Sequence, residues 1–339
     1  PGMTEERLDA LLDYRDEDDV PRPQGAEQDY YDQLAQPYLI PNGPLGTIEE
    51  LLMVKGFNGP VVYGEDANLN GLLDANEDDR DERFPPDDGD GTLNRGLLAF
   101  LAVRPPSAVK GDDDCVSILT ADRAELEDVG LPEQTVRFIL VVREENPMEE
   151  AEGGLKRMQG PLVHRSRLLE ATYELREDHE EFELQAGTTI DSGVGADELP
   201  TVMERLRVVE TGSAWRGVNV NTAPAEVLAT LPGADDFVAQ RIVDHRGGLS
   251  AEEKQTCAWL YTRGVLDAEQ FKEIAPHLTT RSTRYEVRCL GFGVPCGRFC
   301  TLEATIDVSG DRPRIVFLRD ITRLGLPFVP DADELKREG

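Results

Sequence analysis

The sequence predicts an α+β protein in which a mainly helical body precedes a small antiparallel sheet. Three observations predict this class. Apolar residues recur at helical spacing on both sides of Pro232-Gly233. Related patterns occur elsewhere in the chain, which indicates repeats of a helix-hairpin-helix-like, or SAM-like, unit. From Thr283 onward, apolar and polar residues alternate with the two-residue period of strands.

The clearest copy of the repeat is Val218–Arg246, VNVNTAPAEVLATLPGADDFVAQRIVDHR. We expect two short helices joined by a tight hairpin. Thr222 is the expected N-cap of the first helix, and the acidic pair Asp235-Asp236 favours the start of the second. Gly233 supplies the backbone angles that the reversal between the helices requires.

Further copies of the unit are incomplete or more divergent. The opening PGMTEERLDALLDYRD matches the second half, and residues 120–143 match the whole unit with Gly130 at the hairpin. Residues 47–56, TIEELLMVKG, resemble an isolated first half. Because the chain opens inside a repeat, we expect it to be a fragment of a longer protein.

Composition limits the classes of function. The 339 residues are enough for two or three domains, and the 39% of hydrophobic residues permits each to have a core. The net charge of -32 argues against binding to nucleic acid or anionic membranes. No apolar run is long enough to span a bilayer. The five cysteines match no zinc spacing and do not indicate a disulfide-rich scaffold.

We expect five regions along the chain. They are a helical segment with partial repeats (1–56), an acidic insertion (57–110), a helical domain with repeats (111–282), an antiparallel meander (283–328) and a disordered tail (329–339). Within them, helices are expected near residues 2–15, 47–56, 165–184, 198–208, 252–260 and 267–274. Residues 96–104 could be a strand or a short helix. In the connection 16–42, apolar and aromatic residues are expected to pack on the helical body, namely Tyr30, Tyr31, Tyr38 and Ile40.

The acidic insertion contains a complete calcium-loop pattern, DANLNGLLDANE, at residues 66–77. Calcium needs six to eight oxygen ligands, so a short loop must turn sharply at Gly71 to direct them inward. The candidate ligands are Asp66, Asn68, Asn70, the Leu72 carbonyl, Asp74 and Glu77. Leu73 is expected to face the protein and anchor the loop. The alternative is a turn rich in Asn, Asp and Gly that binds nothing.

Two further observations concern the segments on either side of this loop. The preceding residues GPVVYGE do not have a helical pattern, so we expect a calcium loop outside a helix-loop-helix pair. A second acidic segment, residues 87–94, has a similar core but lacks acids at positions one and twelve. Asp88 and Asp90 are candidate ligands of a second ion there, and a flexible acidic loop is the alternative.

The C-terminal meander is predicted from three alternating segments. One strand carries Tyr285, Val287 and Cys289, the next carries Leu302, Ala304, Ile306 and Val308, and the third is residues 314–319, RIVFLR. A hairpin turning at Val294-Pro295 would place Cys289 opposite Cys300. A disulfide between them is possible in an oxidising compartment and would leave Cys296 unpaired.

Several of these segments together resemble one family. The ordered series PRPQGAEQDYY, PYLIPNGPLGTIEELLMVKG, VNVNTAPAEVLATLPG and LTTRSTRYEV, followed by a meander, is similar to the minor pseudopilin K family of the bacterial type II secretion system. The resemblance implies a truncated pilin fold with a helical domain inserted into its sheet. It also implies a hydrophobic N-terminal helix before Pro1 that anchors a periplasmic domain in the inner membrane. The family implies a non-enzymatic role at the pseudopilus tip, with minor pseudopilins I and J as partners.

The rival hypothesis is nucleic-acid binding, because paired helices around a Pro-Gly hairpin also form helix-hairpin-helix DNA modules. Such modules present backbone amides to phosphates. Here Asp235 and Asp236 lie beside that position, and the net charge of -32 opposes phosphate binding. An enzyme is less favoured still, since we find no catalytic triad, phosphate loop or nucleotide fingerprint. The expected cofactor is structural calcium alone.

Overall fold

The computed structural model describes residues 2–80, 82–102, 115–146, 149–150, 156–157, 162–208, 217–293, 296, 298–310 and 312–324. The chain divides into two compact units. The first contains residues 1–105, 285–307 and 313–339, and the second contains residues 106–284 and 308–312. No helix in the described ranges is long and apolar enough to cross a membrane.

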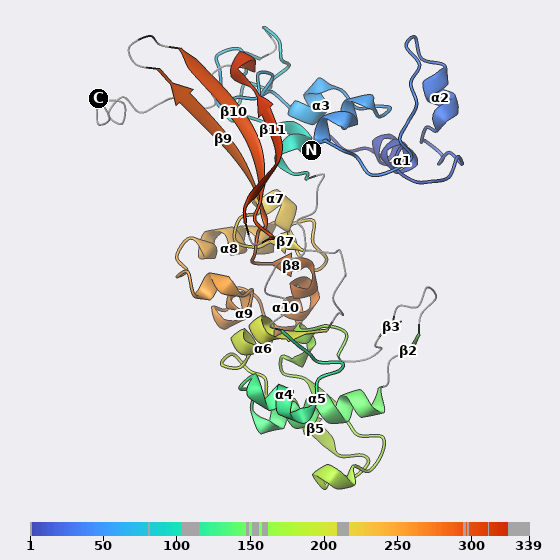
Figure 1. The fold of residues 1–339 in the computed structure, drawn as a ribbon, viewed down its shortest axis with the longest axis vertical. Helices are drawn as coiled ribbons and strands as arrows, with labels where there is room; N and C mark the ends of the chain where they lie inside the picture. The colour runs from blue at the N-terminus through green and yellow to red at the C-terminus, as the bar shows by residue number, and fades with distance from the viewer. Residues whose placement is uncertain are drawn as a thin grey trace. The chain divides into compact units, whose positions relative to one another are not determined.

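The first unit begins with short helices around an aromatic core. They are α1 (Glu5–Asp13), α2 (Gln28–Asp32), the 3-10 helix Ile48–Met53, α3 (Gly59–Tyr63) and the 3-10 helix Gly96–Ala99 (Figure 1). Tyr31 is fully buried at the centre of this core, and Tyr38 and Ile40 pack against it. The prediction that these residues attach the connection 16–42 to the helices is confirmed for Tyr31, Tyr38 and Ile40.

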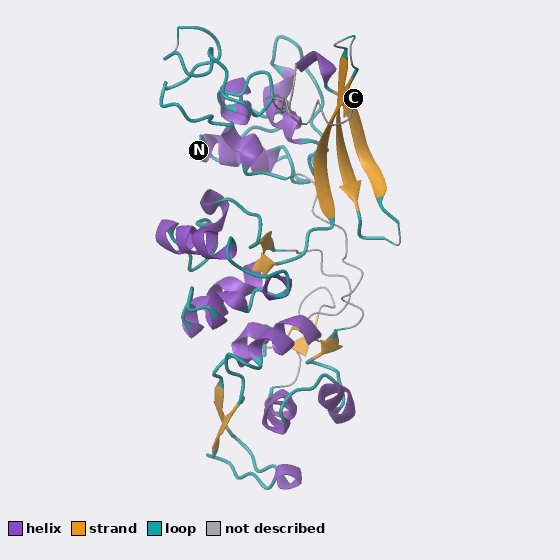
Figure 2. Ribbon diagram, turned by 90° about the vertical axis from the view of Figure 1, so that its left-hand side faces the viewer, coloured by secondary structure: helices purple, strands orange, loops and turns teal. Residues whose placement is uncertain are grey.

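The C-terminal strands of the same unit form a three-stranded sheet (Figure 2). β10 (Phe299–Asp307) lies between β9 (Arg284–Phe292) and β11 (Arg314–Asp320), and it pairs with β11 in antiparallel register. The predicted meander is therefore confirmed. Its predicted turn at Val294-Pro295 lies outside the described residues. Cys289 and Cys300 are exposed and form no disulfide with each other.

The two faces of this sheet differ in polarity. Glu303 pairs with Arg319 across β10 and β11, and Arg319 Nη1 lies 2.8 Å from Glu49 Oε1 in the 3-10 helix Ile48–Met53. Side chains alternate along a strand, so the neighbouring positions lie on the opposite face. That face exposes aliphatic side chains, with Leu318 56% and Ile315 62% exposed. One face thus makes ion pairs within the unit, whereas the other exposes apolar surface.

The second unit is mostly helical. Its helices are α4 (Arg123–Asp128), α5 (Glu133–Glu145), α6 (Leu199–Arg205), α7 (Ala225–Leu228), α8 (Asp236–Arg246), α9 (Trp259–Thr262) and α10 (Ala268–Ile274). Its strands are two to three residues long and pair as β1 (Val116–Ser117) with β6 (Leu206–Arg207), β2 (Glu149–Glu150) with β3 (Lys156–Arg157), β4 (Thr172–Glu174) with β5 (Thr189–Asp191), and β7 (Val218–Asn219) with β8 (Leu278–Thr279). A single apolar cluster that includes Trp259 and Phe271 packs these elements together.

Two segments of this unit have the same local design. In each, a two-residue strand precedes a helix pair and later pairs in parallel with a distant strand, β1 with β6 and β7 with β8. The glycine between the helices has positive φ in both, at 86° for Gly130 and 76° for Gly233. An arginine lies in the last turn of each second helix: Arg143 donates to the Ala121 carbonyl, and Arg246 donates to the Ala223 carbonyl.

Two local predictions in this unit are wrong. Thr222 does not cap α7, because the amides of Thr222 and Ala223 both donate to the Asn219 carbonyl and form a turn that delays the helix to Ala225.

The second wrong prediction concerns residues 165–184, which are not one helical stretch. A 3-10 helix ends at Leu168, and β4 then pairs with β5, so that long-range pairing overrides the local helical pattern.

Candidate calcium loop

The acidic insertion leaves and rejoins the first unit at one narrow neck. Gly64 is the C-cap residue after α3. Its φ of 64° is one that only glycine adopts readily, and a Cβ there would lie 2.1 Å from the Asn94 carbonyl oxygen. The Glu65 amide donates to the same carbonyl at 2.7 Å, and the Asn94 amide donates to the Glu65 carboxylate at 3.0 Å. Gly96, with φ of 56°, lies directly against Gly64. The neck therefore depends on two glycines with no room for side chains.

The segment GPVVYGE before the loop was predicted to be non-helical. This prediction is wrong, because residues 59–63 of the segment form α3. Asn58 caps it by accepting from the Val61 amide, and Pro60 occupies the first turn, where its missing amide costs nothing. No helix follows Glu77 directly in the described residues, so the arrangement is still not a helix-loop-helix pair.

Hydrogen bonds within the loop join most of the predicted ligand residues. The side-chain amides of Asn68 and Asn70 both donate to Asp74 Oδ2, at 2.7 and 2.9 Å. The Gly71 amide donates to Asp66 Oδ2 at 3.0 Å, which uses the positive φ of 73° at Gly71. The Asp74 amide donates to a Glu77 carboxylate oxygen at 3.0 Å. Asn70 Oδ1 accepts from the amide of Leu72, whose carbonyl is the remaining candidate ligand.

The acids at positions one and twelve are the buried ones. Asp66 and Glu77 are each only 1% exposed, and one oxygen of each, Asp66 Oδ1 and Glu77 Oε1, has no hydrogen-bond partner among the described residues. Burial raises the pKa of both carboxyl groups, and the nearby charges of Asp66 and Asp74 raise the pKa of Glu77 further. Two orphaned, buried carboxylate oxygens fit the ligand requirements of a hard cation.

Three residues that the motif does not include also contact this loop. Arg95 Nε lies 3.7 Å from Asp66 Oδ2, and Arg288 of β9 donates to the Leu69 carbonyl at 2.5 Å. Glu65 forms part of the neck. Leu73 was predicted to anchor the loop, but it is exposed, so this prediction is wrong. The loop is instead attached to the unit by the neck and by Arg288.

The second acidic segment differs from the first. Asp88 and Asp90 are exposed, and their carboxylates accept from the Asp90 and Thr92 amides in short local turns. The Gly91 amide donates to Asp78 at 3.0 Å, which ties this segment back to the residues after the calcium motif. The structure does not bring Asp88 or Asp90 into contact with the predicted ligands of the first loop through any described hydrogen bond.

The hairpin between α7 and α8 bears on nucleic-acid binding. A Cβ at Gly233 would lie 2.6 Å from the Glu273 carboxyl group, so this carboxylate lies against the hairpin. Asp235 accepts from the Val238 amide and uses up one of the free amides at the start of α8. Negative charge thus occupies the position where a phosphate would approach.

Comparison with known families gives two matches. Two family models, both described as type II secretion system (T2SS), protein K, match residues 2–63 and 218–258. Two separate segments of the chain are thus similar to protein K of the type II secretion system. The first match contains α1, α2 and α3, and the second contains β7, α7 and α8. No curated protein and no solved structure matches the chain.

The protein K matches end before the calcium motif and begin again well after it. The first stops at Tyr63, the last residue of α3, and the loop starts three residues later at Asp66. The family assignment therefore supports a role as a component of type II secretion. It carries no information on whether the loop binds calcium.

Proposed function

We propose that this protein K is a non-enzymatic minor pseudopilin of the pseudopilus tip, the periplasmic part of a protein anchored in the inner membrane. The two protein K matches carry this proposal, since they lie in different units of one chain. The terminal sheet corresponds to a truncated pilin-like sheet, and the helix pairs of the second unit are copies of one helix-hairpin-helix-like unit with a structural role. The Glu273 carboxylate at Gly233 supports this role over nucleic-acid binding.

The partners are other minor pseudopilins of the I and J types, and the apolar face of the terminal sheet is their contact surface. Monomeric proteins rarely expose contiguous apolar patches without a function. Here β10 and β11 expose Leu302, Leu318 and Ile315 on one face, while the opposite face is occupied by the Glu303–Arg319 ion pair. An assembly partner would remove these aliphatic side chains from water.

Co-expression with I-type and J-type pseudopilins from the same genome should yield a co-eluting complex. Leu318→Asp places a charge on the apolar face and should weaken the association by about tenfold or more. Phe237→Asp is the matched control, because Phe237 is 69% exposed on α8 in the other unit and should have no effect. Failure of the unmodified chain to associate would contradict the tip-complex proposal.

Calcium is proposed as a structural ion of the loop 66–77. The buried oxygens of Asp66 and Glu77 would bind it from positions one and twelve. The side-chain oxygens of Asn68, Asn70 and Asp74 and the Leu72 carbonyl would complete the ligands. The ion would neutralise carboxylates that burial and mutual repulsion otherwise destabilise. The exposed pair Asp88 and Asp90 would take a second ion only with ligands from elsewhere.

Calcium should raise the melting temperature of the chain, and a chelator should lower it. An ion that binds only the folded state stabilises it by about 2.7 kcal/mol at a hundredfold excess over its Kd. Glu77→Gln should remove most of this response, because the substitution removes a buried charge from position twelve. Differential scanning calorimetry with calcium and with chelator measures the effect.

The control is Asn76→Ala at position eleven, which is not a ligand position. Its side chain donates to the Phe84 carbonyl at the surface, so the calcium response should stay intact. A melting temperature indifferent to calcium and chelator in the unmodified chain would mean that the loop is an ordinary turn.

A further inference from the structure

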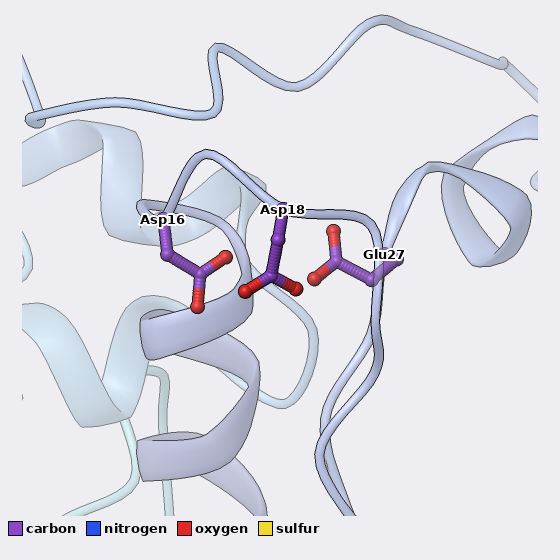
Figure 3. A group of neighbouring side chains, drawn as sticks. All are labelled: Asp16, Asp18 and Glu27. Carbon is purple, nitrogen blue, oxygen red and sulfur yellow. The ribbon is translucent and has the colours of Figure 1, made fainter.

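A second group of acids in the first unit, outside the calcium motif, converges on one point. Carboxylate oxygens of Asp16, Asp18 and Glu27 all lie within 4.8 Å of one another, and this is the only such group among the residues that the structure describes (Figure 3). Asp16 and Asp18 follow α1, whereas Glu27 immediately precedes α2. The group therefore joins the two ends of the connection between these helices.

Glu27 is the residue that distinguishes this group from an ordinary acidic surface. It is only 5% exposed, and neither of its carboxylate oxygens has a hydrogen-bond partner among the described residues. It occupies the N-cap position of α2 but makes no side-chain cap bond. Its carboxylate points instead toward Asp18 (Figure 3). A buried carboxylate with two unused oxygens requires a partner that these side chains do not supply.

Arg22 pairs with one member of this group, Asp16, but it is shared with Asp13 outside the group. Arg22 Nη1 lies 2.6 Å from Asp13 Oδ1 and 2.6 Å from Asp16 Oδ2, and the Arg22 amide also donates to the fully buried Asp13. Asp16 Oδ1 remains buried without a partner, and Asp18 uses one oxygen to accept from the Val20 amide. One arginine therefore faces several carboxylates, and the local charge stays negative.

We propose that Asp16, Asp18 and Glu27 bind one divalent cation of the calcium class, which fastens the end of α1 to the start of α2. Carboxylate oxygens are the ligands that hard cations prefer. Calcium binds oxygens at about 2.3–2.6 Å, so ligands on opposite sides of the ion are separated by about 5 Å. The spread of these oxygens satisfies that limit. Because Asp18 is exposed, water can complete the coordination.

A proton is the competitor of the cation at this site. Burial, followed by the charges of Asp13, Asp16, Asp18 and Asp19, raises the pKa of Glu27 to about 7. A neutral Glu27 would relieve the same repulsion without any metal. Binding must therefore be measured at pH 8, where a proton competes least.

Calorimetric titration of the whole chain with calcium, and separately with magnesium, tests this site. The Glu77→Gln background removes the loop 66–77 from the measurement, and we expect one remaining equivalent of cation. Adding Glu27→Gln should abolish it, and Asp18→Asn should weaken it by about tenfold or more. Asp29→Asn is the control, because it removes one exposed acid from α2 outside the group.

Asp18 is exposed, so its substitution tests the ligand role even if Glu27→Gln disturbs folding, which circular dichroism would reveal. Absence of any cation binding at pH 8, or binding that survives Asp18→Asn unchanged, would overturn the proposal. The site does not depend on the loop 66–77. If that loop fails to bind calcium, the unmodified chain should show the same single equivalent as Glu77→Gln.

Discussion

Gly64→Ala should destabilise the first unit by about 3–5 kcal/mol, which is among the largest effects expected of a single methyl group. The new Cβ would meet the Asn94 carbonyl oxygen at 2.1 Å and the Gly96 amide nitrogen at 2.4 Å, and both are backbone atoms that cannot rotate away. The φ of 64° adds strain. Hydrogen exchange of α1 and α3 measures the loss in this unit directly.

Gly91→Ala separates the steric clash of a new Cβ from the strain of a left-handed backbone conformation. Gly91 lies in the same insertion with φ of 78°, but a Cβ there would meet no atom within 4 Å. Its cost should be only the left-handed backbone conformation, about 1–2 kcal/mol. Equal effects of the two substitutions would show that the close approach at the neck does not matter.

Tyr31→Ala should cost about 3–5 kcal/mol, because it empties the centre of the aromatic core. Tyr31 is fully buried, and its ring lies 5.2, 5.3 and 5.9 Å from the rings of Tyr30, Tyr38 and Tyr14. These rings come from separate segments of the connection and from the end of α1. The free energy of unfolding from urea titration should fall accordingly.

Tyr31→Phe is the conservative comparison. It retains the ring but removes the hydroxyl that accepts from the Lys55 amide at 3.2 Å, so the expected cost is about 1–2 kcal/mol. Burial also raises the pKa of Tyr31 to about 12. If Tyr31→Phe were as damaging as Tyr31→Ala, the hydrogen bond rather than the packing would hold this core.

Elements whose signals are local were predictable from the sequence. Asp235 caps α8 and Asp267 caps α10 as their positions before apolar runs indicate, because capping depends on residues three apart. The strand alternation after Thr283 also predicted β9, β10 and β11. The sequence pattern predicted a helix where the structure has β4. This strand was not predictable, since it depends on pairing with β5 about fifteen residues later.

In the candidate calcium loop, too, the local features were predictable from the sequence and the long-range contacts were not. The calcium pattern located Asp66 and Glu77, which the structure buries with unused oxygens. It could not reveal Arg288, which reaches the loop from a strand 219 residues away. The acids around Asp16 stand out in the sequence, but only the fold selects Glu27 as the buried one among them.

The contact of Arg288 with Leu69 also bears on the order in which the chain can fold. Together with the Arg319–Glu49 pair, whose residues are 270 apart, it means that the first unit is assembled from the two ends of the chain. The second unit is almost continuous in sequence and contains its own apolar cluster. Contacts between distant residues form slowly, because the intervening chain must first be brought together. During synthesis, the contacts of the first helical segment with the sheet must therefore wait for the last strands, while the middle of the chain is free to fold first.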